Sequence, residues 1–514
     1  MKFILNDYDD IKTFVESLNI EKLLTVVCCP NMSAVVGGPE PYEDSVAHFI
    51  SYGTEENVEK LTRKIHSDAE NKLIAADFEN GAAAGIKGKT LFPDMMAFGI
   101  ADDEEAAYKM GVVCAAESRP LGYTWTFAPC VDIAVNKLNP IVNIRCLGDD
   151  VEQIIRIGGA YMRGLQDNGI IATLKHFPGD GVGVYDQHLT VGENSLSKEE
   201  WDKSFGRIYS ELIGQGAMSV MVGHISLGAY DEKDEKMDMY PPATVSKRII
   251  TDLLKKKLGF EGLVISDAMN MGGHCGYINL YDGCCKFLES GGDCLLFVHP
   301  NEEFQTEMKV RIEKGLLSVD TLKNRAYRVL CFARQYSEEP KPIPVVSGED
   351  ARKFSDEIVE KACTVIRDRE GILPFEVKKD TKILHLGVYN NYAREDVDRI
   401  TSELKKDSDN VVFLDDPGPN EILRNIKKNK YDLIVCTIGC RFSYGTNAIK
   451  LYGPTARNMM SGWTKMGIPV VFVNFGNPWL SDEYKATIDT LINTYGCTNH
   501  TAEVVVRKIF KEHN

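Results

Sequence analysis

Short apolar runs rich in β-branched residues alternate with helical patterns along residues 1–340. Most of these runs are continuously apolar, which is typical of strands buried on both faces of a parallel sheet. The runs are Leu23–Cys29, Lys72–Phe78, Thr124–Ala128, Ile171–Phe177, Ser219–Ile225, Gly262–Asp267 and Asp293–Val298. Helical periodicity lies between several of them, at Glu55–Asn71, Glu104–Arg119, Val151–Gly169, Lys198–Gly214 and Ser246–Lys257.

This alternation predicts a TIM-like (β/α)8 barrel over residues 1–340, with an open doubly wound sheet as the alternative. The charged, proline-rich segment Glu338–Pro344 favours a linker, which we place at residues 341–350. A helix is expected over Ala351–Cys363, and strands and helices alternate again afterwards. A smaller α/β sandwich domain is therefore expected over residues 351–514, from patterns at Lys382–Val388, Val411–Leu414, Asp432–Ile438, Val470–Asn474 and Ala502–Lys511.

Composition and charge narrow the classes of protein. The 514 residues include 59 Lys and Arg against 75 Asp and Glu, a net charge of −16, so nucleic acid is not an expected partner. No apolar stretch approaches the roughly 18 residues of a membrane span, and the run Phe3–Leu5 is too short for an export signal. The 14 scattered cysteines then predict free thiols in a reducing cytoplasm. Nothing in these patterns indicates an oligomeric state.

Polar residues follow several of the predicted strands. In a parallel barrel the active site lies at the carboxyl ends of the strands. An acid or a histidine in one such place would suit a helix cap or a satisfied core residue, but their succession predicts a polar pocket. The residues are Asp77, Asp132, Lys175, His176, His224 and Asp267, with Arg145 further along the loop that holds Asp132.

The loop KHFPGDGVGVYDQHL, from Lys175 to Leu189, carries the clearest chemical pattern. Its glycines favour a turning, flexible segment. Near its end, Asp186 and His188 are two residues apart, and such side chains point the same way in an extended segment. An Asp–His contact would fix the tautomer of the imidazole ring and raise its basicity. The alternative is a surface loop with an incidental acid and histidine.

Several segments together resemble the family 3 glycoside hydrolases, in the two-domain form of the β-N-acetylhexosaminidase-like branch. The resemblance covers nearly the whole chain. Its most specific part is the combination of the KHFPG loop with SDAMNM after a predicted strand. The matching segments are Ile74–Gly81, Phe92–Gly99, Trp125–Ile133, Asn139–Asp150, Lys175–Gly181, Met221–Ile225, Gly259–Met271 and Val473–Pro478.

The resemblance implies a role for each matching residue. Asp267 matches the nucleophile that forms a covalent glycosyl-enzyme, and His188 with Asp186 behind it matches the acid/base dyad. The implied sugar-binding residues are Asp77, Arg145, Lys175 and His176, with His224 and Asp132 as further pocket residues. The implied activity is that of a retaining, exo-acting β-N-acetylglucosaminidase that takes a small carbohydrate and needs no cofactor or metal.

The chain departs from the family pattern at the rim of the expected pocket. Asn80 replaces the first glycine of the usual Asp-Gln-Glu-Gly-Gly-Arg segment, and Ala82 stands where the arginine would be. Gln187 replaces the usual serine between the two dyad residues. The identity of the sugar and of its leaving group therefore stays open.

Other activities fit the same residues. The scaffold also suits a β-glucosidase or a glycoside phosphorylase, because an imidazole acid/base repels phosphate less than a carboxylate does. A metal-dependent barrel hydrolase would use His176, His188, His224 and Asp267 as ligands of zinc or manganese. A sugar-binding protein without catalysis is a further alternative, which the presence of Asp267 beside the possible dyad disfavours.

Overall fold

The computed structural model describes residues 2–34, 40–67, 71–389, 394–442, 444–445, 448–451 and 456–511. The chain forms two compact units. The first comprises Met1–Leu91, Asp102–Val142 and Cys146–Ala351, and the second comprises Phe92–Ala101, Asn143–Arg145 and Arg352–Asn514. Two short segments from the first third of the chain therefore belong with its C-terminal part, which no sequence pattern indicated. The expected domain limits at residues 340 and 351 stay a prediction.

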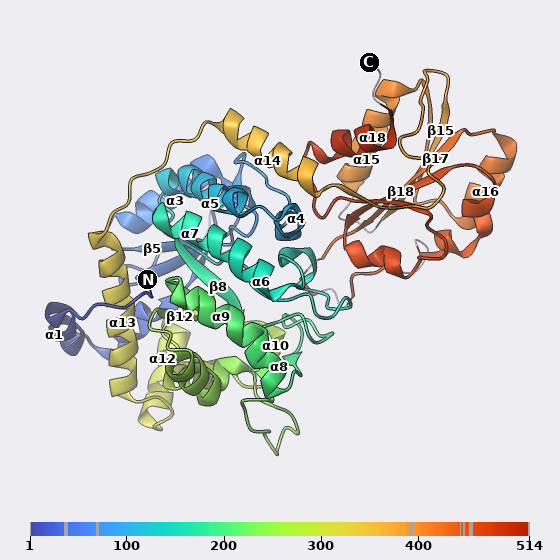
Figure 1. Cartoon of the computed structure of the whole chain (residues 1–514). Helices are drawn as coiled ribbons and strands as arrows, with labels where there is room; N and C mark the ends of the chain where they lie inside the picture. The colour runs from blue at the N-terminus through green and yellow to red at the C-terminus, as the bar shows by residue number, and fades with distance from the viewer. Residues whose placement is uncertain are drawn as a thin grey trace. The chain divides into compact units, whose positions relative to one another are not determined.

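A curled parallel sheet forms the centre of the first unit (Figure 1). Its seven strands lie in the order β12-β10-β8-β7-β5-β3-β2, and every neighbouring pair is parallel. The strands are β2 (Asn31–Met32), β3 (Ala47–Ile50), β5 (Leu73–Ala76), β7 (Trp125–Thr126), β8 (Ile171–Phe177), β10 (Ser219–Val222) and β12 (Leu263–Ser266). A separate parallel pair joins β1 (Cys28–Cys29) to β13 (Leu295–Leu296). Every residue of β8 is buried, as its continuous apolar pattern predicted.

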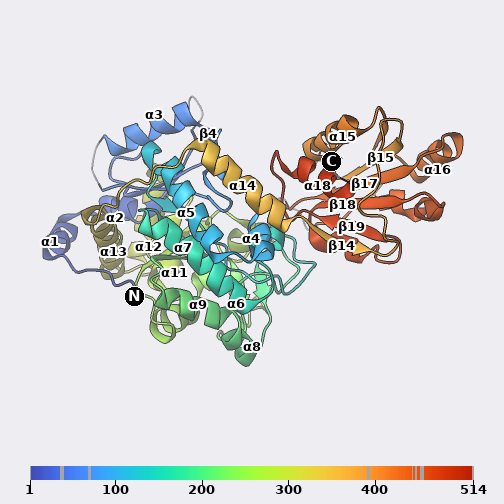
Figure 2. The same cartoon turned by 45° about the horizontal axis from the view of Figure 1, so that its top comes forward.

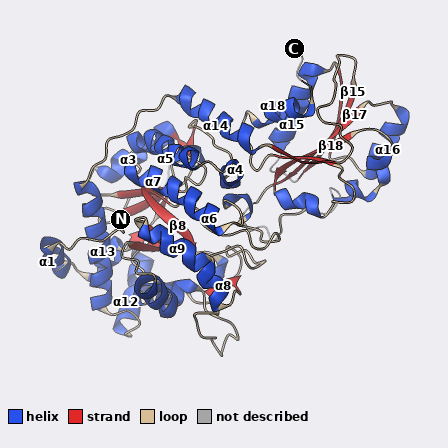
Figure 3. Cartoon of the chain, in the orientation of Figure 1, coloured by secondary structure: helices blue, strands red, loops and turns tan. Residues whose placement is uncertain are grey.

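Helices follow most of these strands and lie outside them, as the secondary-structure colours make plain (Figure 3). Side chains cap several helix starts, for example at Thr54 and Asp103, whose oxygens accept backbone N–H groups of the first turn. The principal helices are α3 (Glu55–His66), α5 (Glu104–Ser118), α7 (Gly159–Asp167), α9 (Phe205–Gly214), the π-helical η6 (Arg248–Lys257), α11 (Leu280–Glu289), α12 (Glu302–Glu313) and α13 (Val319–Glu338). Residues 68–70 of the expected helix Glu55–Asn71 lie outside the described residues.

The second unit is built on a six-stranded sheet in the order β14-β19-β18-β17-β15-β16. Only β14 runs antiparallel to its neighbour. The strands are β14 (Thr364–Asp368), β15 (Lys382–Tyr389), β16 (Asn410–Asp415), β17 (Leu433–Cys440), β18 (Val470–Gly476) and β19 (Thr490–Asn493). The expected strands at Lys382–Val388, Val411–Leu414, Asp432–Ile438 and Val470–Asn474 are confirmed.

Alternate residues of this sheet pack into two separate cores. Ile383 and Val435 face a core shared with the helices α14 (Gly348–Ala362), α15 (Arg394–Asp407) and α18 (Thr501–Ile509). Leu384 and Ile434 face the other core, which includes residues of α16 (Pro419–Lys428). Figure 2 shows α15 and α16 with the strands between them. Both faces of the sheet are thus covered by helices.

The sequence predicted no membrane span and free cysteine thiols. In the part of the chain that the structure describes, no helix has the length and apolar character needed to cross a membrane. All 14 cysteines lie within the described residues, and every one is a free thiol.

Candidate functional site

The expected pocket residues of the first unit follow the carboxyl ends of neighbouring strands. Asp77 comes directly after β5 and Asp267 directly after β12. Lys175 and His176 lie in the last part of β8, and His224 lies just beyond β10. Because these parallel strands are close in the sheet order, their ends meet at one edge, as chain direction in a parallel sheet predicts.

Lys175 joins two carboxylates at the end of β5. Its Nζ lies 2.9 Å from Asp77 Oδ1 and 2.6 Å from Glu79 Oε1. The lysine side chain is only 3% exposed, whereas that of Asp77 is 40% exposed. The buried ammonium group therefore fixes an Asp77 carboxylate that still faces solvent, and such a carboxylate can accept hydrogen bonds from sugar hydroxyls.

His176 is held by a fully buried carboxylate. Its Nδ1 lies 2.6 Å from Asp132 Oδ2, and its backbone N–H donates to Asp132 Oδ1 at 3.2 Å. Burial raises the pKa of Asp132, but the charge and hydrogen bond of His176 outweigh burial and hold this pKa below its usual value. The pair fixes the orientation of the His176 ring.

Asp186 and His188 are in direct contact. His188 Nδ1 lies 2.7 Å from Asp186 Oδ1, and the backbone N–H of His188 donates to the same oxygen at 2.9 Å. The Asp186 side chain is fully buried and that of His188 is 25% exposed. The backbone here is a turn closed by Leu189 N–H donating to Asp186 O at 2.9 Å, and not the extended segment from which the contact was predicted. The two side chains meet because the turn folds His188 back over Asp186.

Asp267 lies beside three histidines. Burial raises its pKa, but the charges of His176, His224 and His188 together outweigh burial and lower the pKa below its usual value. The backbone N–H of Ala268 also donates to Asp267 Oδ1, at 2.8 Å. An ionised carboxylate is a suitable nucleophile.

His224 is bonded to the protein through both ring nitrogens. Nδ1 lies 3.0 Å from Thr244 Oγ1, and Nε2 lies 3.0 Å from the carbonyl oxygen of Ala268. The residue is fully buried, and burial lowers its pKa. In this arrangement neither nitrogen is available to a sugar, and His224 holds the chain that follows Asp267.

Arg145 belongs to the second compact unit. It is buried, and its guanidinium carbon lies 5.6 Å from the centre of the Phe442 ring, which is a cation–π distance. Its role in binding sugar together with Asp77 and Lys175 stays a prediction.

Three further residues take part in the site although no role was expected of them. Glu79 and Asp77 both pair with the ammonium group of Lys175, as described above. Asp180 donates its backbone N–H to Asp132 Oδ1 at 2.8 Å, and burial together with the Asp132 charge raises its pKa to about 6. Gln187 is fully buried between the dyad residues. A signal was present for Gln187, since it departs from the family's serine, but the loop conformation that buries it is not encoded in any short pattern.

The metal hypothesis has a different set of candidate ligands from the one expected. Among the described residues, one group of three or more His, Cys, Asp or Glu has ligand atoms within 4.8 Å of one another, and it consists of Cys130, Asp132 and His176. Its closest contact is the 2.6 Å hydrogen bond between His176 and Asp132. The expected set with His188, His224 and Asp267 does not form such a group.

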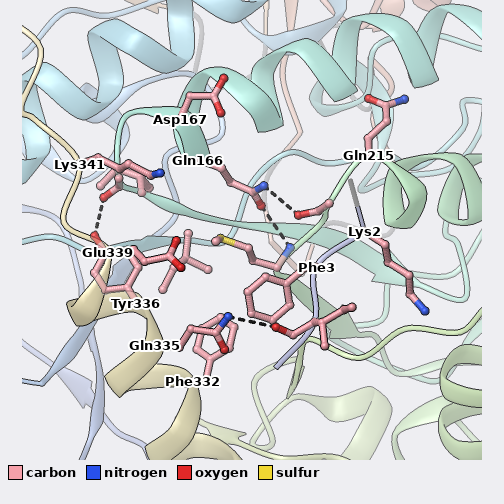
Figure 4. Close-up of a pocket in the computed structure, with 16 residues that line it drawn as sticks. Lys2, Phe3, Gln166, Asp167, Gln215, Phe332, Gln335, Tyr336, Glu339 and Lys341 are labelled. Carbon is pink, nitrogen blue, oxygen red and sulfur yellow. Dashed lines mark hydrogen bonds between the residues drawn. The ribbon is translucent and has the colours of Figure 1, made fainter. Parts of the chain in front are cut away.

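A separate cavity of about 490 Å³ opens at the other ends of the strands (Figure 4). Ile171, which begins β8, and Met218, which precedes β10, are among its lining residues. The amide of Gln166 is engaged here, since its Nε2 donates to Gly216 O at 3.0 Å and its Oε1 accepts Met218 N–H at 3.2 Å. The Gln335 amide is likewise bonded to the N-terminal segment, at Ile4 O and Asn6 N–H. These hydrogen bonds hold the side chains of Gln166 and Gln335 in place in the wall of the cavity.

Comparison with known proteins supplies a family for the chain. Residues 30–332 match the family described as "Glycosyl hydrolase family 3 N terminal domain". A protein of Cellulomonas fimi named "Beta-N-acetylglucosaminidase/beta-glucosidase" is 29% identical over 458 residues, which cover 84% of this chain and 80% of that protein.

Solved structures are similar over almost the whole chain. A structure described as "Beta-glucoside phosphorylase BglX bound to 2FGlc" has a TM-score of 0.87 and 26% identity, and covers 99% of this chain and 95% of its own. A glycoside hydrolase family 3 β-N-acetylglucosaminidase from Paenibacillus sp. str. FPU-7 has a TM-score of 0.78 and 22% identity, with 96% of each chain covered. At that identity, the second similarity concerns the fold alone.

Proposed function

Because the chain belongs to glycosyl hydrolase family 3, we propose that it is a retaining, exo-acting β-N-acetylglucosaminidase. The observation that carries the proposal is the 2.7 Å contact between Asp186 and His188, together with the buried carboxylate of Asp267, whose pKa the charge of His188 helps to lower. The name of the Cellulomonas fimi relative supports the N-acetylglucosamine substrate.

In the proposed reaction, Asp267 attacks the anomeric carbon of a terminal β-linked sugar. His188, positioned by Asp186, donates its Nε2 proton to the departing glycosidic oxygen. A covalent glycosyl-aspartate forms as the bond to the leaving group breaks. His188 then takes a proton from water, the oxygen of which attacks the anomeric carbon and releases Asp267 and the β-sugar. Two inversions give net retention.

The contacts of the residues at the strand ends support the sugar-binding roles. We assign Asp77, Lys175 and His176 to the sugar hydroxyls, with Arg145 as a further binding residue. Asp132 orients His176, and His224 orients the chain after Asp267, because both of its nitrogens are bonded to protein groups. No metal or cofactor enters these steps.

A second candidate is phosphorolysis, in which phosphate takes the place of water. The 26% identical structure described as a β-glucoside phosphorylase favours it, as does an acid/base that carries no negative charge. The carboxylates of Asp77 and Glu79 oppose it, because they carry two negative charges against the single ammonium of Lys175 and repel an incoming phosphate. Hydrolysis therefore stays the first candidate.

The decisive measurement compares p-nitrophenyl β-glycosides of N-acetylglucosamine and of glucose, each with and without inorganic phosphate. We expect faster release from the N-acetylglucosaminide, free N-acetylglucosamine as the product, and a first-formed β-anomer by NMR. Sugar 1-phosphate formed in the phosphate arm would replace hydrolysis with phosphorolysis. A preference for the glucoside would overturn the N-acetyl specificity, and no release from either would overturn the activity.

Lys175→Ala tests the sugar-binding assignment. Loss of the ammonium leaves Asp77 and Glu79 without their shared partner, and we expect KM for the same substrate to rise about 10- to 100-fold while kcat falls less. Lys203→Ala is the matched control, because Lys203 pairs with Glu199 at 2.6 Å on the exposed surface. A Lys175 variant with unchanged KM would contradict the assignment.

The proposal extends to the fold and to the location of the protein. The curled sheet closes as a TIM-like (β/α)8 barrel, which the β1–β13 pair and the bridge from Cys294 to Ile265 of β12 support. An α/β sandwich domain follows from residue 351 after a linker at 341–350. A cytoplasmic location is supported by the free thiols.

A further inference from the structure

The side chain of Gln187 ties the dyad loop to a neighbouring strand end. Gln187 is fully buried. Its Oε1 accepts the backbone N–H of His224, just beyond β10, at 2.9 Å. Its Nε2 donates to Asp180 Oδ2 at 3.4 Å. The amide oxygen is therefore bonded to the segment after β10, and the amide nitrogen is bonded to Asp180 in the same loop as Gln187.

The backbone carbonyl groups of Gln187 and His188 are hydrogen-bonded to the segment that follows Asp267. The carbonyl oxygen of Gln187 accepts the N–H of Gly273 at 3.0 Å, and that of His188 accepts the N–H of Gly272 at 2.9 Å. The approach needs glycine, because a Cβ at Gly273 would lie 2.5 Å from Gln187 O and one at Gly272 would lie 2.8 Å from His188 O. The acid/base loop and the nucleophile segment are thus joined directly.

Asp180 is a fixed partner for the amide. Its Oδ1 accepts N–H groups of Asn139 at 3.0 Å and of Gly181 at 2.6 Å. Gly179 and Gly181 have φ of 117° and 101°, so these two glycines turn the loop and place Asp180 inside. The Asp180 side chain is only slightly exposed and can accept from Gln187 without competition from bulk water.

We propose that Gln187 is a positioning residue that holds Asp186 and His188 in place beside Asp267 before any sugar binds. The inference rests on the proposed function. The glycine content of the loop alone favours a flexible segment, whereas the contacts of Gln187 hold the acid/base in place. Gln187 stands where the family pattern has serine, a side chain too short to reach both His224 N–H and Asp180. The tie from Gln187 to both groups is therefore not available to a chain with serine at this place.

The experiment uses Gln187→Ala and the shape-preserving Gln187→Met in the full chain. A misplaced His188 cannot protonate the departing oxygen, and p-nitrophenolate is more basic than 2,4-dinitrophenolate, so kcat on the p-nitrophenyl N-acetylglucosaminide is expected to fall about 10- to 100-fold, a part of the general acid–base contribution. With a 2,4-dinitrophenyl leaving group, which needs little protonation, the bond-breaking step should change about threefold at most. Azide, which needs no general base, should then restore turnover. A loss of folded protein would lower all these rates together.

Two further variants supply the reference points. His188→Ala gives the full cost of losing the acid/base. Gln166→Ala is the matched control, because its amide also bridges two backbone groups, but at the opposite strand ends (Figure 4). Its kcat should equal that of the wild type. If His188→Ala is impaired while both Gln187 variants keep the wild-type rate and leaving-group dependence, the positioning role is wrong. If His188→Ala is unimpaired as well, the proposed function itself fails.

Hydrogen exchange tests the preassembly without reference to activity. In the free wild-type protein, the amides of Gly272, Gly273 and Leu189 should be protected, and adding N-acetylglucosamine should change their exchange little. In Gln187→Ala they should exchange faster, with the change confined to these segments. Protection that arises in the wild type only when sugar is added would overturn the proposal in favour of a loop that closes on the substrate.

Discussion

Replacing Asp267 with alanine is expected to lower kcat/KM on the p-nitrophenyl N-acetylglucosaminide roughly 10⁴-fold or more, the scale seen when a nucleophile is removed. The carboxylate is buried, yet its pKa lies below the usual value, because three neighbouring histidines favour the charged form. Asp267 is therefore ionised across the neutral range and able to attack. Steady-state kinetics of the purified variant, with circular dichroism to verify the fold, measure the effect.

The identity of the nucleophile can be tested by two complementary results. In Asp267→Gly, added azide should enter the vacated space and yield the α-glycosyl azide, the product of a single displacement. In His188→Ala with a 2,4-dinitrophenyl substrate, the covalent adduct should accumulate and map by mass spectrometry to the peptide that contains Asp267. An adduct on another carboxylate, such as Asp77, would contradict the assignment.

The histidines around Asp267 have different tasks. His188 contacts Asp186 and keeps part of its side chain exposed, as an acid/base must. His176 is fixed by Asp132, and His224 has both nitrogens bonded within the protein. The sequence predicts all three at one edge of a sheet but does not separate these tasks, because the separation depends on which partner each ring nitrogen meets.

Parts of the fold that depend on long apolar runs could be predicted from the sequence. Ile171–Phe177 is a strand with the bounds expected from its pattern. Leu23–Cys29 was predicted as one strand, but Ile20–Val26 forms helix α2 and only Cys28–Cys29 is a strand. An apolar run this short suits both structures, and the cap that decides is Asn19, whose side chain accepts Lys22 N–H.

Other elements escaped prediction because their signal is short or mixed. Strand β3 (Ala47–Ile50) includes the buried His48, which interrupts its apolar pattern. Strand β19 (Thr490–Asn493) has polar ends. Their places are set by pairing with neighbouring strands, and such pairing joins residues far apart in the chain.

The site shows the same limit in a different form. Residues that follow strand ends, such as Asp77 and Asp267, could be named because chain direction alone carries them to one edge of the sheet. Asp180 and Gln187 could not, because their burial depends on a loop turned by Gly179 and Gly181 and packed on distant segments. A Cβ at Gly181 would lie 1.9 Å from the Ile133 carbonyl oxygen, which shows how closely the two loops approach.

Asp293→Ala is expected to lower the free energy of unfolding by about 3–5 kcal/mol, as when one partner of a buried ion pair is removed. Asp293 is fully buried, and its Oδ1 lies 2.9 Å from Arg328 Nε, 3.4 Å from Lys255 Nζ and 3.6 Å from Arg325 Nη1. Burial already lowers the pKa of Lys255 to about 8 despite the attraction of Asp293. Removing the carboxylate leaves three cations without their shared anion. The midpoint of urea unfolding of the full chain measures the loss.

The pH dependence identifies the ion pairs as the cause. Burial raises the pKa of Asp293, but the neighbouring cations outweigh burial and hold it well below the usual value. The unfolded chain therefore binds this proton more readily, so the contribution is fully present above about pH 5 and is lost as the pH falls below the unfolded pKa of about 3.9. The difference in the free energy of unfolding between wild type and Asp293→Asn should thus become smaller from about pH 5 to about pH 3.

Asp252→Ala is the matched control. Asp252 pairs with Lys256 on the exposed side of η6, the helix that also carries Lys255, and its loss should lower the free energy of unfolding by less than about 1 kcal/mol. A constant gap between wild type and Asp293→Asn across this range would contradict the electrostatic origin, since Asn keeps the acceptor for Val264 N–H and removes only the charge.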